Sequence, residues 1–484
     1  MHFATCYEEW RDAAIAFDES VGNDRWRRTD RTDRYDYVSI RTRLDRLRSL
    51  RARHDNKKLL YALNEGIHGN MGGMGRPSLY SKALYGTKHL VSDYVEEIAS
   101  ALEYLASDAV DDIQFEEKLD FFRRAHHCFG RSALMMSGSG TFFYFHLGVV
   151  KALYEQGVLP DTLSGSSGGA LVGSMVSTRD PESMAEIFDP EYVAYEPADT
   201  RGFLKSWCGL KPQMVRAEDV PPMFQRLLPD LTFQEAFELT GRNLNISIAA
   251  AETHQTSRLL NAVTSPTVFI REAVLASSAV PGLIPPVVLS AKDSEGLKQA
   301  YLPSRKWVDG SVSDDMPTKR LSRLYGINHY VVSQTNPHVI PFVSDTKKKH
   351  DAASIIKTAS SRTAREWINA GAGLTEKRLN RAPSLKRVIN TGISMINQDY
   401  MGDINILPSN RLINPLTVLT FQPVERIREL IVSGEKATWP KIEMIRIQTR
   451  ISRTLDDILG HYENIFAGEQ RTSKSKPIQA NRVR

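Results

Sequence analysis

Apolar and polar positions alternate along this chain in two different ways. Near the N-terminus they recur at helical spacing, and residues 91–105 place Tyr94, Ile98 and Leu102 on one face of a predicted helix. Between residues 131 and 340, short apolar runs instead alternate with glycine-rich turns and helical stretches. The apolar runs predict strands at 132–136, 244–250 and 330–332. This order of elements predicts an α/β domain over 131–340, with a mainly parallel sheet flanked by helices.

Helical patterns also predict additions at both ends of this domain. Residues 1–130 form a mostly helical N-terminal domain in this interpretation, and patterns at 355–372 and 425–459 indicate a helical C-terminal region over 341–467. The tail, 468–484, is basic and lacks an apolar cluster, which is typical of disorder. A chain of 484 residues is long enough for more than one core.

The stretch 162–173 carries the strongest signal of chemistry. It predicts a short strand, a turn of glycine and serine, and a helix of small residues, with Gly-x-Ser-x-Gly at the turn. The pattern alone arises by chance in roughly one chain in six of this length, but the flanking strand and helix are the context of a nucleophile elbow. Gly165 and Gly169 are needed there because side chains would strike the neighbouring strand or helix. Ser167 is therefore the predicted nucleophile.

A second glycine turn follows the predicted strand 132–136 and contains Gly138, Ser139 and Gly140. Backbone N–H groups at such a turn, before a helix, can bind a phosphate or stabilise an oxyanion. A phosphate loop is disfavoured because its Lys-Ser/Thr is missing and Phe143 stands where a dinucleotide fingerprint has its last glycine. We expect an oxyanion hole, with a plain strand-to-helix turn as the alternative.

A serine nucleophile needs a base. Asp309, followed by Gly310, ends a short apolar strand and is the predicted base, although an Asp-Gly turn without chemistry gives the same pattern. The rival arrangement is a triad in the order serine, acid, histidine, completed by His329 or His338.

Taken together and in this order, these motifs resemble the patatin-like phospholipases. The likeness extends over nearly the whole chain, and it is also carried by the runs 145–153 and 276–282. Outside the predicted α/β domain it points to the subgroup that includes lipid-droplet triacylglycerol lipases, which carry an uncharacterised helical N-terminal domain; the runs concerned are 7–10, 35–37, 79–80, 86–88, 333–338 and 437–440.

The resemblance implies a serine acyl hydrolase of lipid esters that uses a Ser–Asp dyad and an acyl-enzyme. Ser167 would attack, Asp309 would take its proton, and the turn from Gly138 to Gly140 would supply oxyanion donors. Triacylglycerol is the expected substrate; a phospholipase A or lysophospholipase, a transacylase and a non-catalytic lipid-surface protein are the alternatives. Phe143 and Ser139 depart from the family's glycine-rich motif.

Composition adds expectations about surroundings. The net charge is +5, and the three cysteines, Cys6, Cys128 and Cys208, are too few and scattered for a disulfide framework or zinc site. The N-terminus lacks a basic region followed by an apolar core, and no apolar run reaches the length of a membrane span. We therefore expect a cytoplasmic protein, not secreted, in peripheral contact with a membrane or lipid droplets, with no metal or organic cofactor. The sequence does not indicate an oligomeric state.

Two further segments are candidates for lipid contact. Residues 25–53 contain eleven arginines against four aspartates, which indicates either a cationic face for anionic head groups or a solvated helix with internal ion pairs. No nucleic-acid-binding motif accompanies them. The apolar stretches 203–210 and 283–289 are predicted to line an acyl channel, to rest on lipid, or to be ordinary core.

Overall fold

The computed structural model describes residues 1, 3–67, 70–195, 214–252, 256–312, 315–337, 339–340, 402–410 and 415–474. These residues fall into two compact units. The first comprises Met1–Asp12 and Ser132–Ile442, and the second Ala13–Arg131 and Glu443–Arg484.

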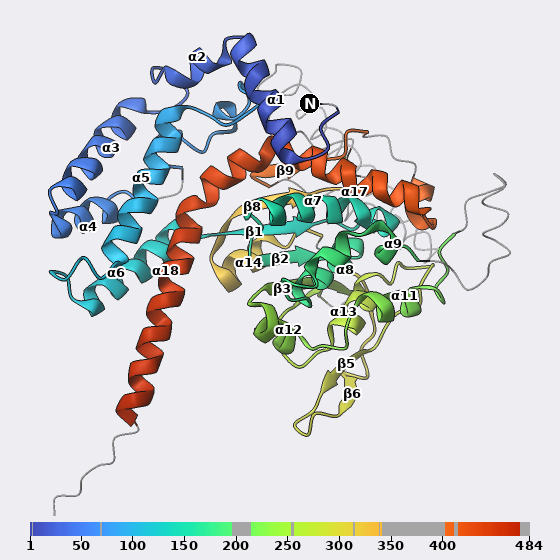
Figure 1. Cartoon of the computed structure of the whole chain (residues 1–484). Helices are drawn as coiled ribbons and strands as arrows, with labels where there is room; N and C mark the ends of the chain where they lie inside the picture. The colour runs from blue at the N-terminus through green and yellow to red at the C-terminus, as the bar shows by residue number, and fades with distance from the viewer. Residues whose placement is uncertain are drawn as a thin grey trace, which may run out of the picture. The chain divides into compact units, whose positions relative to one another are not determined.

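A twisted sheet forms the centre of the first unit (Figure 1). Its strands follow the spatial order β4-β3-β2-β1-β8-β9, with β7 also pairing with β3. The pairs β1 with β2, β2 with β3, and β8 with β9 are parallel, whereas β4 and β7 run antiparallel to β3. The bounds are β1 Arg131–Met136, β2 Thr162–Gly165, β3 Asn243–Ala250, β4 Arg258–Leu260, β7 Trp307–Asp309, β8 Ile327–Ser333 and β9 Ile404–Ile406.

The predicted α/β class is thus confirmed, as are the strands predicted at 132–136, 244–250 and 330–332. The sequence did not predict the antiparallel strand β4. It also missed the separate hairpin of β5 (Leu289–Lys292) and β6 (Lys298–Tyr301).

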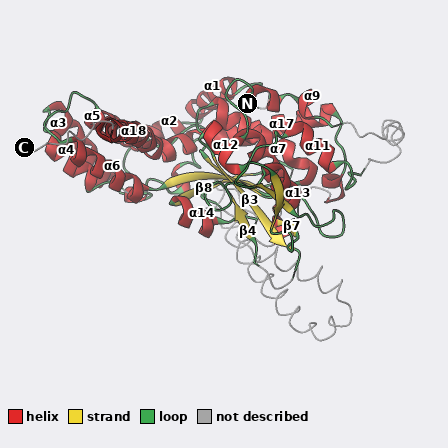
Figure 2. Ribbon diagram, turned by 90° about the horizontal axis from the view of Figure 1, so that it is seen from below, coloured by secondary structure: helices red, strands yellow, loops and turns green. Residues whose placement is uncertain are grey.

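Successive side chains of β1 serve opposite faces of the sheet. Ala133 and Met135 pack in a cluster with Leu321 of α14 (Thr318–Tyr325). Met136 lies against Gly173 of α8 (Gly168–Ser177), on the other face. Helices therefore cover both faces of the sheet (Figure 2). Further helices among the described residues of this unit are α9 Pro190–Val193, α11 Val220–Leu227, α12 Phe233–Thr240 and α13 Ile270–Ser277.

Two helices distant in sequence, α7 (Phe143–Glu155) and α17 (Val424–Thr438), lie side by side (Figure 1). Glycine on each helix allows their backbones to touch. A Cβ atom on Gly148 would lie 1.9 Å from the Ile431 carbonyl oxygen, and one on Gly434 would lie 2.2 Å from the Phe145 carbonyl oxygen. The C-terminal helix α17 is therefore part of the unit that contains the sheet.

Helices make up the second unit. They are α2 Asn23–Arg28, α3 Tyr37–Ala52, α4 Asn56–Asn64, α5 His89–Ala106, α6 Phe115–Phe129 and α18 Ile442–Lys474, and α1 (Tyr7–Ser20) spans the boundary between the units. Arg450 of α18 bonds to Glu96 and Glu103 of α5, and Tyr462 stacks on Phe115 of α6 with ring centroids 5.1 Å apart. Residues 443–467, predicted as part of a C-terminal region, thus pack with the N-terminal helices.

Two predictions at the C-terminal end are wrong in part. The helical pattern at 425–459 is broken by the 3₁₀ turn Trp439–Lys441, because Pro440 has no N–H for the helical ladder. The tail predicted to be disordered from residue 468 is helical as far as Lys474, since it continues α18. The helix predicted at 355–372 lies outside the described residues.

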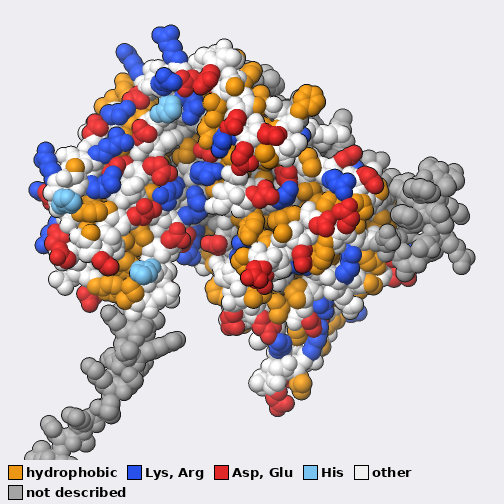
Figure 3. All heavy atoms as spheres, in the orientation of Figure 1, with side chains coloured by type: hydrophobic (Ala, Val, Ile, Leu, Met, Phe, Trp, Pro, Cys, Tyr) orange, Lys and Arg blue, Asp and Glu red, His pale blue; other side chains and the backbone are white. Residues whose placement is uncertain are grey.

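The arginine-rich run is largely paired within its own unit. Glu97, whose side chain is 5% exposed, accepts two 2.9 Å hydrogen bonds from Arg51 and lies 3.5 Å from Arg48. Basic and acidic side chains are interspersed over these helices (Figure 3). Eight of the eleven arginines contact an acidic, carbonyl, hydroxyl or aromatic group of this unit: Arg27, Arg28, Arg34, Arg41, Arg43, Arg46, Arg48 and Arg51.

Candidate active site

Ser167 sits on a strained bend between β2 and α8. Its backbone has φ 50° and ψ −122°, a region that residues with side chains rarely adopt. A Cβ on Gly165 would lie 2.3 Å from the Gly169 carbonyl carbon, and one on Gly169 would lie 2.3 Å from the Met136 carbonyl oxygen. Only glycine fits at both positions, and the bend places the Ser167 side chain at the carboxyl ends of the parallel strands.

The side chain of a second serine, Ser277, holds the backbone of Ser167 in place. The Ser167 N–H donates to Ser277 Oγ at 2.9 Å, and the Ser277 hydroxyl donates to the Ser247 carbonyl at 2.7 Å. Ser277 ends α13 and Ser247 belongs to β3, so two elements fix the bend. The Ser167 N–H is therefore engaged. The first backbone N–H after it that could donate to an oxyanion is that of Gly168.

Asp309 lies beside Ser167 at the end of β7. Its side chain is buried, lies near enough to the Ser167 hydroxyl to interact with it, and accepts a hydrogen bond from the Ser311 N–H at 2.8 Å. Burial raises the pKa of Asp309 from its ordinary value of 3.8 to about 6, against the lowering effect of these contacts. A Cβ on Gly310 would lie 2.1 Å from the Ser247 carbonyl oxygen, so the turn after Asp309 also requires glycine.

The glycine turn after β1 runs alongside the elbow. Gly140 has φ 51°, and a Cβ there would lie 2.3 Å from the Val418 carbonyl oxygen. Ser139 is 3% exposed, and a Cβ on Gly168 would lie 2.2 Å from its Oγ, which places this turn against the start of α8.

One of the three predicted oxyanion donors departs from its expected role. The Gly138 N–H already donates to Asp315 Oδ1 at 3.0 Å, and an N–H has one hydrogen to give. The N–H groups of Ser139 and Gly140 stay predicted donors, and that of Gly168 joins them by position.

Sequence reasoning missed Asp315. This carboxylate is 1% exposed and accepts hydrogen bonds from the Gly138 N–H and the Ser166 hydroxyl, so it joins the glycine turn to the nucleophile elbow. The available signal was a pair of aspartates shortly after Asp309. Acidic residues in a loop ordinarily indicate solvent exposure, so the sequence alone does not distinguish this one.

The histidines are placed for other tasks. His146 is buried in α7, where its ring contacts the Ser333 hydroxyl at 2.6 Å and the Ser137 carbonyl at 3.1 Å, and burial lowers its pKa to about 4. His329 contacts Ser132 Oγ at 2.9 Å near the beginnings of β8 and β1, at the edge of the sheet opposite Ser167. His338 lies outside the described residues. Among those described, Asp309 is the ionisable side chain in contact with Ser167.

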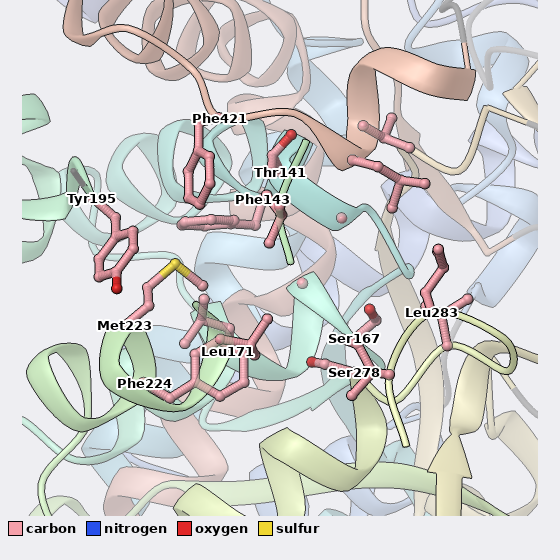
Figure 4. Close-up of a pocket in the computed structure, with 18 of the residues that line it drawn as sticks. Thr141, Phe143, Ser167, Leu171, Tyr195, Met223, Phe224, Ser278, Leu283 and Phe421 are labelled. Atoms are coloured by element: carbon pink, nitrogen blue, oxygen red, sulfur yellow. The ribbon is translucent and has the colours of Figure 1, made fainter. Parts of the chain in front are cut away.

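An apolar pocket of about 270 Å³ opens beside Ser167 (Figure 4). Phe143, which the sequence identified as a departure in the glycine-rich motif, forms part of its wall, with its N–H bonded to the Gly140 carbonyl. Leu283 and Ile284 of the predicted apolar stretch 283–289 also line it, whereas 203–210 lies outside the described residues. Other lining side chains are Thr141, Tyr144, Leu171, Tyr195, Val220, Met223, Phe224, Val280, Val418, Leu419 and Phe421.

Within the described part of the chain, no cluster of three or more histidine, cysteine, aspartate or glutamate side chains is arranged to hold a metal ion. Within the same residues, no helix combines the length and apolar character needed to cross a bilayer.

Comparisons with known proteins identify two family profiles and relatives that match most of the chain. A family profile described as "Patatin-like phospholipase" matches residues 134–321, and one described as "Domain of unknown function (DUF3336)" matches residues 1–127. A patatin-like phospholipase domain-containing protein of Coccidioides immitis is 32% identical and covers 99% of this chain and 70% of its own length. A patatin-like phospholipase domain-containing protein of Emericella nidulans is 31% identical, and the match covers 92% of this chain and 62% of the relative. The chain thus spans between about three fifths and seven tenths of these relatives.

A solved structure, that of VipD from Legionella pneumophila, matches 71% of this chain and 76% of its own at 14% identity. Its TM-score is 0.28.

Proposed function

This chain belongs to the patatin-like phospholipase family, and on that premise we propose that it is a lipase that cleaves lipid esters with a Ser167–Asp309 dyad. The observation that carries the proposal is the position of the Ser167 hydroxyl beside a buried carboxylate, at one end of an apolar pocket. The raised pKa of Asp309 suits a proton acceptor near neutral pH.

In the proposed mechanism, Ser167 Oγ attacks the ester carbonyl carbon while its proton passes to the Asp309 carboxylate. The oxyanion that forms is stabilised by N–H groups of Ser139, Gly140 and Gly168. The C–O bond to the alcohol then breaks, the alcohol leaves with the proton from Asp309, and an acyl-serine remains. Water attacks this ester, Asp309 takes the proton of the water, and the fatty acid leaves as Ser167 is reprotonated.

Triacylglycerol is the substrate that we propose first. The pocket walls are apolar, and the charged residue among them, Arg216, is exposed and lies 3.2 Å from Glu218, which balances its charge. A neutral ester should therefore bind in this pocket as well as an ester that carries a phosphate. Phospholipase A or lysophospholipase activity, and acyl transfer to an alcohol other than water, are the alternatives that the same dyad allows.

We further propose that the mouth of the pocket meets a lipid surface, either a membrane or a lipid droplet. Leu283 is 52% exposed and lines the pocket (Figure 4). Apolar side chains at the entrance can bury themselves in lipid while an ester enters.

The test is fatty-acid release by the purified protein from triolein emulsion and phosphatidylglycerol vesicles in parallel. We expect release from triolein that Ser167→Ala abolishes and that the control Ser183→Ala leaves unchanged, because the Ser183 hydroxyl bonds to Asp180 and lies outside the pocket lining.

Release from vesicles alone would make the protein a phospholipase. New esters formed on adding diacylglycerol or lysophospholipid would make it a transacylase. Full activity of Ser167→Ala would contradict the mechanism.

A further inference from the structure

The pocket beside Ser167 has one wall that comes from far along the chain. Residues 415–422, here called the C-terminal strap, consist of the 3₁₀ helix η8 (Pro415–Leu419) and the three residues after it. They lie outside the region 134–321 that matches the patatin-like profile. Their side chains Val418, Leu419 and Phe421 nevertheless line the pocket.

Two neighbouring segments of the chain contact the backbone carbonyls of the strap and hold it in place. On one side, the Thr141 hydroxyl donates to the Thr417 carbonyl at 3.3 Å, and the Val418 carbonyl lies so close to Gly140 that a Cβ there would be 2.3 Å away. On the other side, the Val215 N–H donates to the Leu419 carbonyl at 2.8 Å. The strap is thus bonded to the glycine turn as well as to the segment that precedes α11.

An aromatic pair lines the pocket at the end remote from the nucleophile. Tyr195 and Phe421 stack with ring centroids 5.7 Å apart and an angle of 27° between their planes. Figure 4 shows Ser167 and Ser278 at one end, and Tyr195, Met223 and Phe421 toward the other. An acyl chain whose carbonyl carbon meets Ser167 Oγ would therefore extend toward this pair.

We propose that Phe421, positioned by the C-terminal strap and stacked on Tyr195, sets the length of the acyl chain that the pocket accepts. This inference rests on the proposed ester hydrolysis. A chain that fills the space between Ser167 and the aromatic pair buries all of its methylenes, whereas a longer one must displace a ring. Each methylene that fits or fails to fit such a pocket changes kcat/KM by about tenfold or more.

The experiment compares kcat/KM for p-nitrophenyl esters from butyrate to stearate in wild type, Phe421→Ala and Phe421→Trp. Removing the ring extends the pocket, so Phe421→Ala raises the ratio of palmitate to octanoate turnover by about tenfold, and the larger indole of Phe421→Trp lowers it. Phe237→Ala is the matched control, because Phe237 is 37% exposed on α12 and does not line the pocket. Melting curves establish that each variant folds, and Leu419→Ala is a second test of the strap.

An unchanged ratio in both Phe421 variants of an active enzyme would overturn the inference and leave the proposed function standing. Failure of the proposed function looks different: wild type would release no product from any ester, and a fluorophosphonate would not label Ser167. The role of the pair is then decided by binding of fatty acids of graded length to Ser167→Ala protein. A length optimum that moves with Phe421→Ala supports it, and one that stays contradicts it.

Discussion

The surroundings of Ser167 and the arginine-rich helices α2 and α3 both concentrate polar side chains, but they use them differently. Around Ser167, a few buried groups are held at fixed distances by glycine turns, and the nucleophile, the carboxylate and an apolar pocket converge. In the arginine run, eight of eleven side chains contact partners of their own unit. Density of charge therefore says less about chemistry than the backbone constraint around a single hydroxyl.

The largest expected effect is that of Asp309→Asn. The amide cannot accept the proton of Ser167, so we expect turnover to fall by about 10⁴-fold, a loss of the size measured for acids of hydrolase active sites. Ester hydrolysis by matched amounts of folded protein measures it. Turnover within tenfold of wild type would show that another group is the base.

The same variant should gain stability in a pH-dependent way. The pKa of Asp309 is about 6 in the folded protein and ordinarily 3.8, so folding is penalised as the pH rises between these values and fully above 6. Asp309→Asn removes a penalty of about 3 kcal/mol at pH 8 and little at pH 4. Urea denaturation at both pH values tests this, and an equal gain at both would contradict the assigned pKa.

The next effect is that of Asp315→Ala. It leaves the Gly138 N–H and the Ser166 hydroxyl buried without their acceptor, at a cost of about 1 to 3 kcal/mol each, and loosens the glycine turn. We expect kcat to fall by about 100-fold with little change in KM, because this residue positions the donors and does not line the pocket.

Asp315→Asn keeps an acceptor oxygen and should retain activity within about tenfold of wild type. Asp180→Ala is the control, since that carboxylate is exposed and bonds to Ser183. A rise in KM at constant kcat would show instead that Asp315 acts on substrate binding.

The pH profile should follow the charge of the proposed base. Asp309 accepts a proton only when ionised, so kcat/KM for a soluble ester should fall by about tenfold for each pH unit below 6. His146 stays neutral down to about pH 4 and adds no step of its own above that value. A fall whose midpoint lies near pH 7 would indicate a histidine base instead.

The smallest effect on catalysis is expected in the arginine run. Glu97→Gln weakens the contacts to Arg48 and Arg51. The free energy of unfolding of this unit should therefore fall by about 1 to 3 kcal/mol. Activity per folded molecule should stay within twofold of wild type. A tenfold loss of activity without a loss of stability would show that the arginine run also acts in catalysis, and would contradict the distinction between the two regions.

What the sequence predicted was local. The elbow at 165–169, the strand at 132–136 and the Asp-Gly turn at 309–310 are each set by neighbouring residues, so spacing alone indicated them. What it missed depends on distant partners. Ser166 and Asp315 are 149 residues apart, and Thr141 bonds to a carbonyl 276 residues away. Nothing in a short window of sequence indicates which distant group will fill such a contact.

The break between α17 and α18 at Pro440 is an exception, because its cause is local and the sequence pattern nevertheless predicted a continuous helix. Periodic apolar positions continue across Pro440, and the pattern outweighed the missing N–H in the interpretation of 425–459.

The glycine contact between α7 and α17 bears on how a smaller fragment could be prepared. α17 ends at Thr438, more than a hundred residues beyond the patatin-like match at 134–321. A protein cut at residue 321 or 340 would lose the helix whose Gly434 meets Gly148 and would leave that face of α7 in water. A soluble catalytic fragment should therefore be cloned with its downstream border after α17.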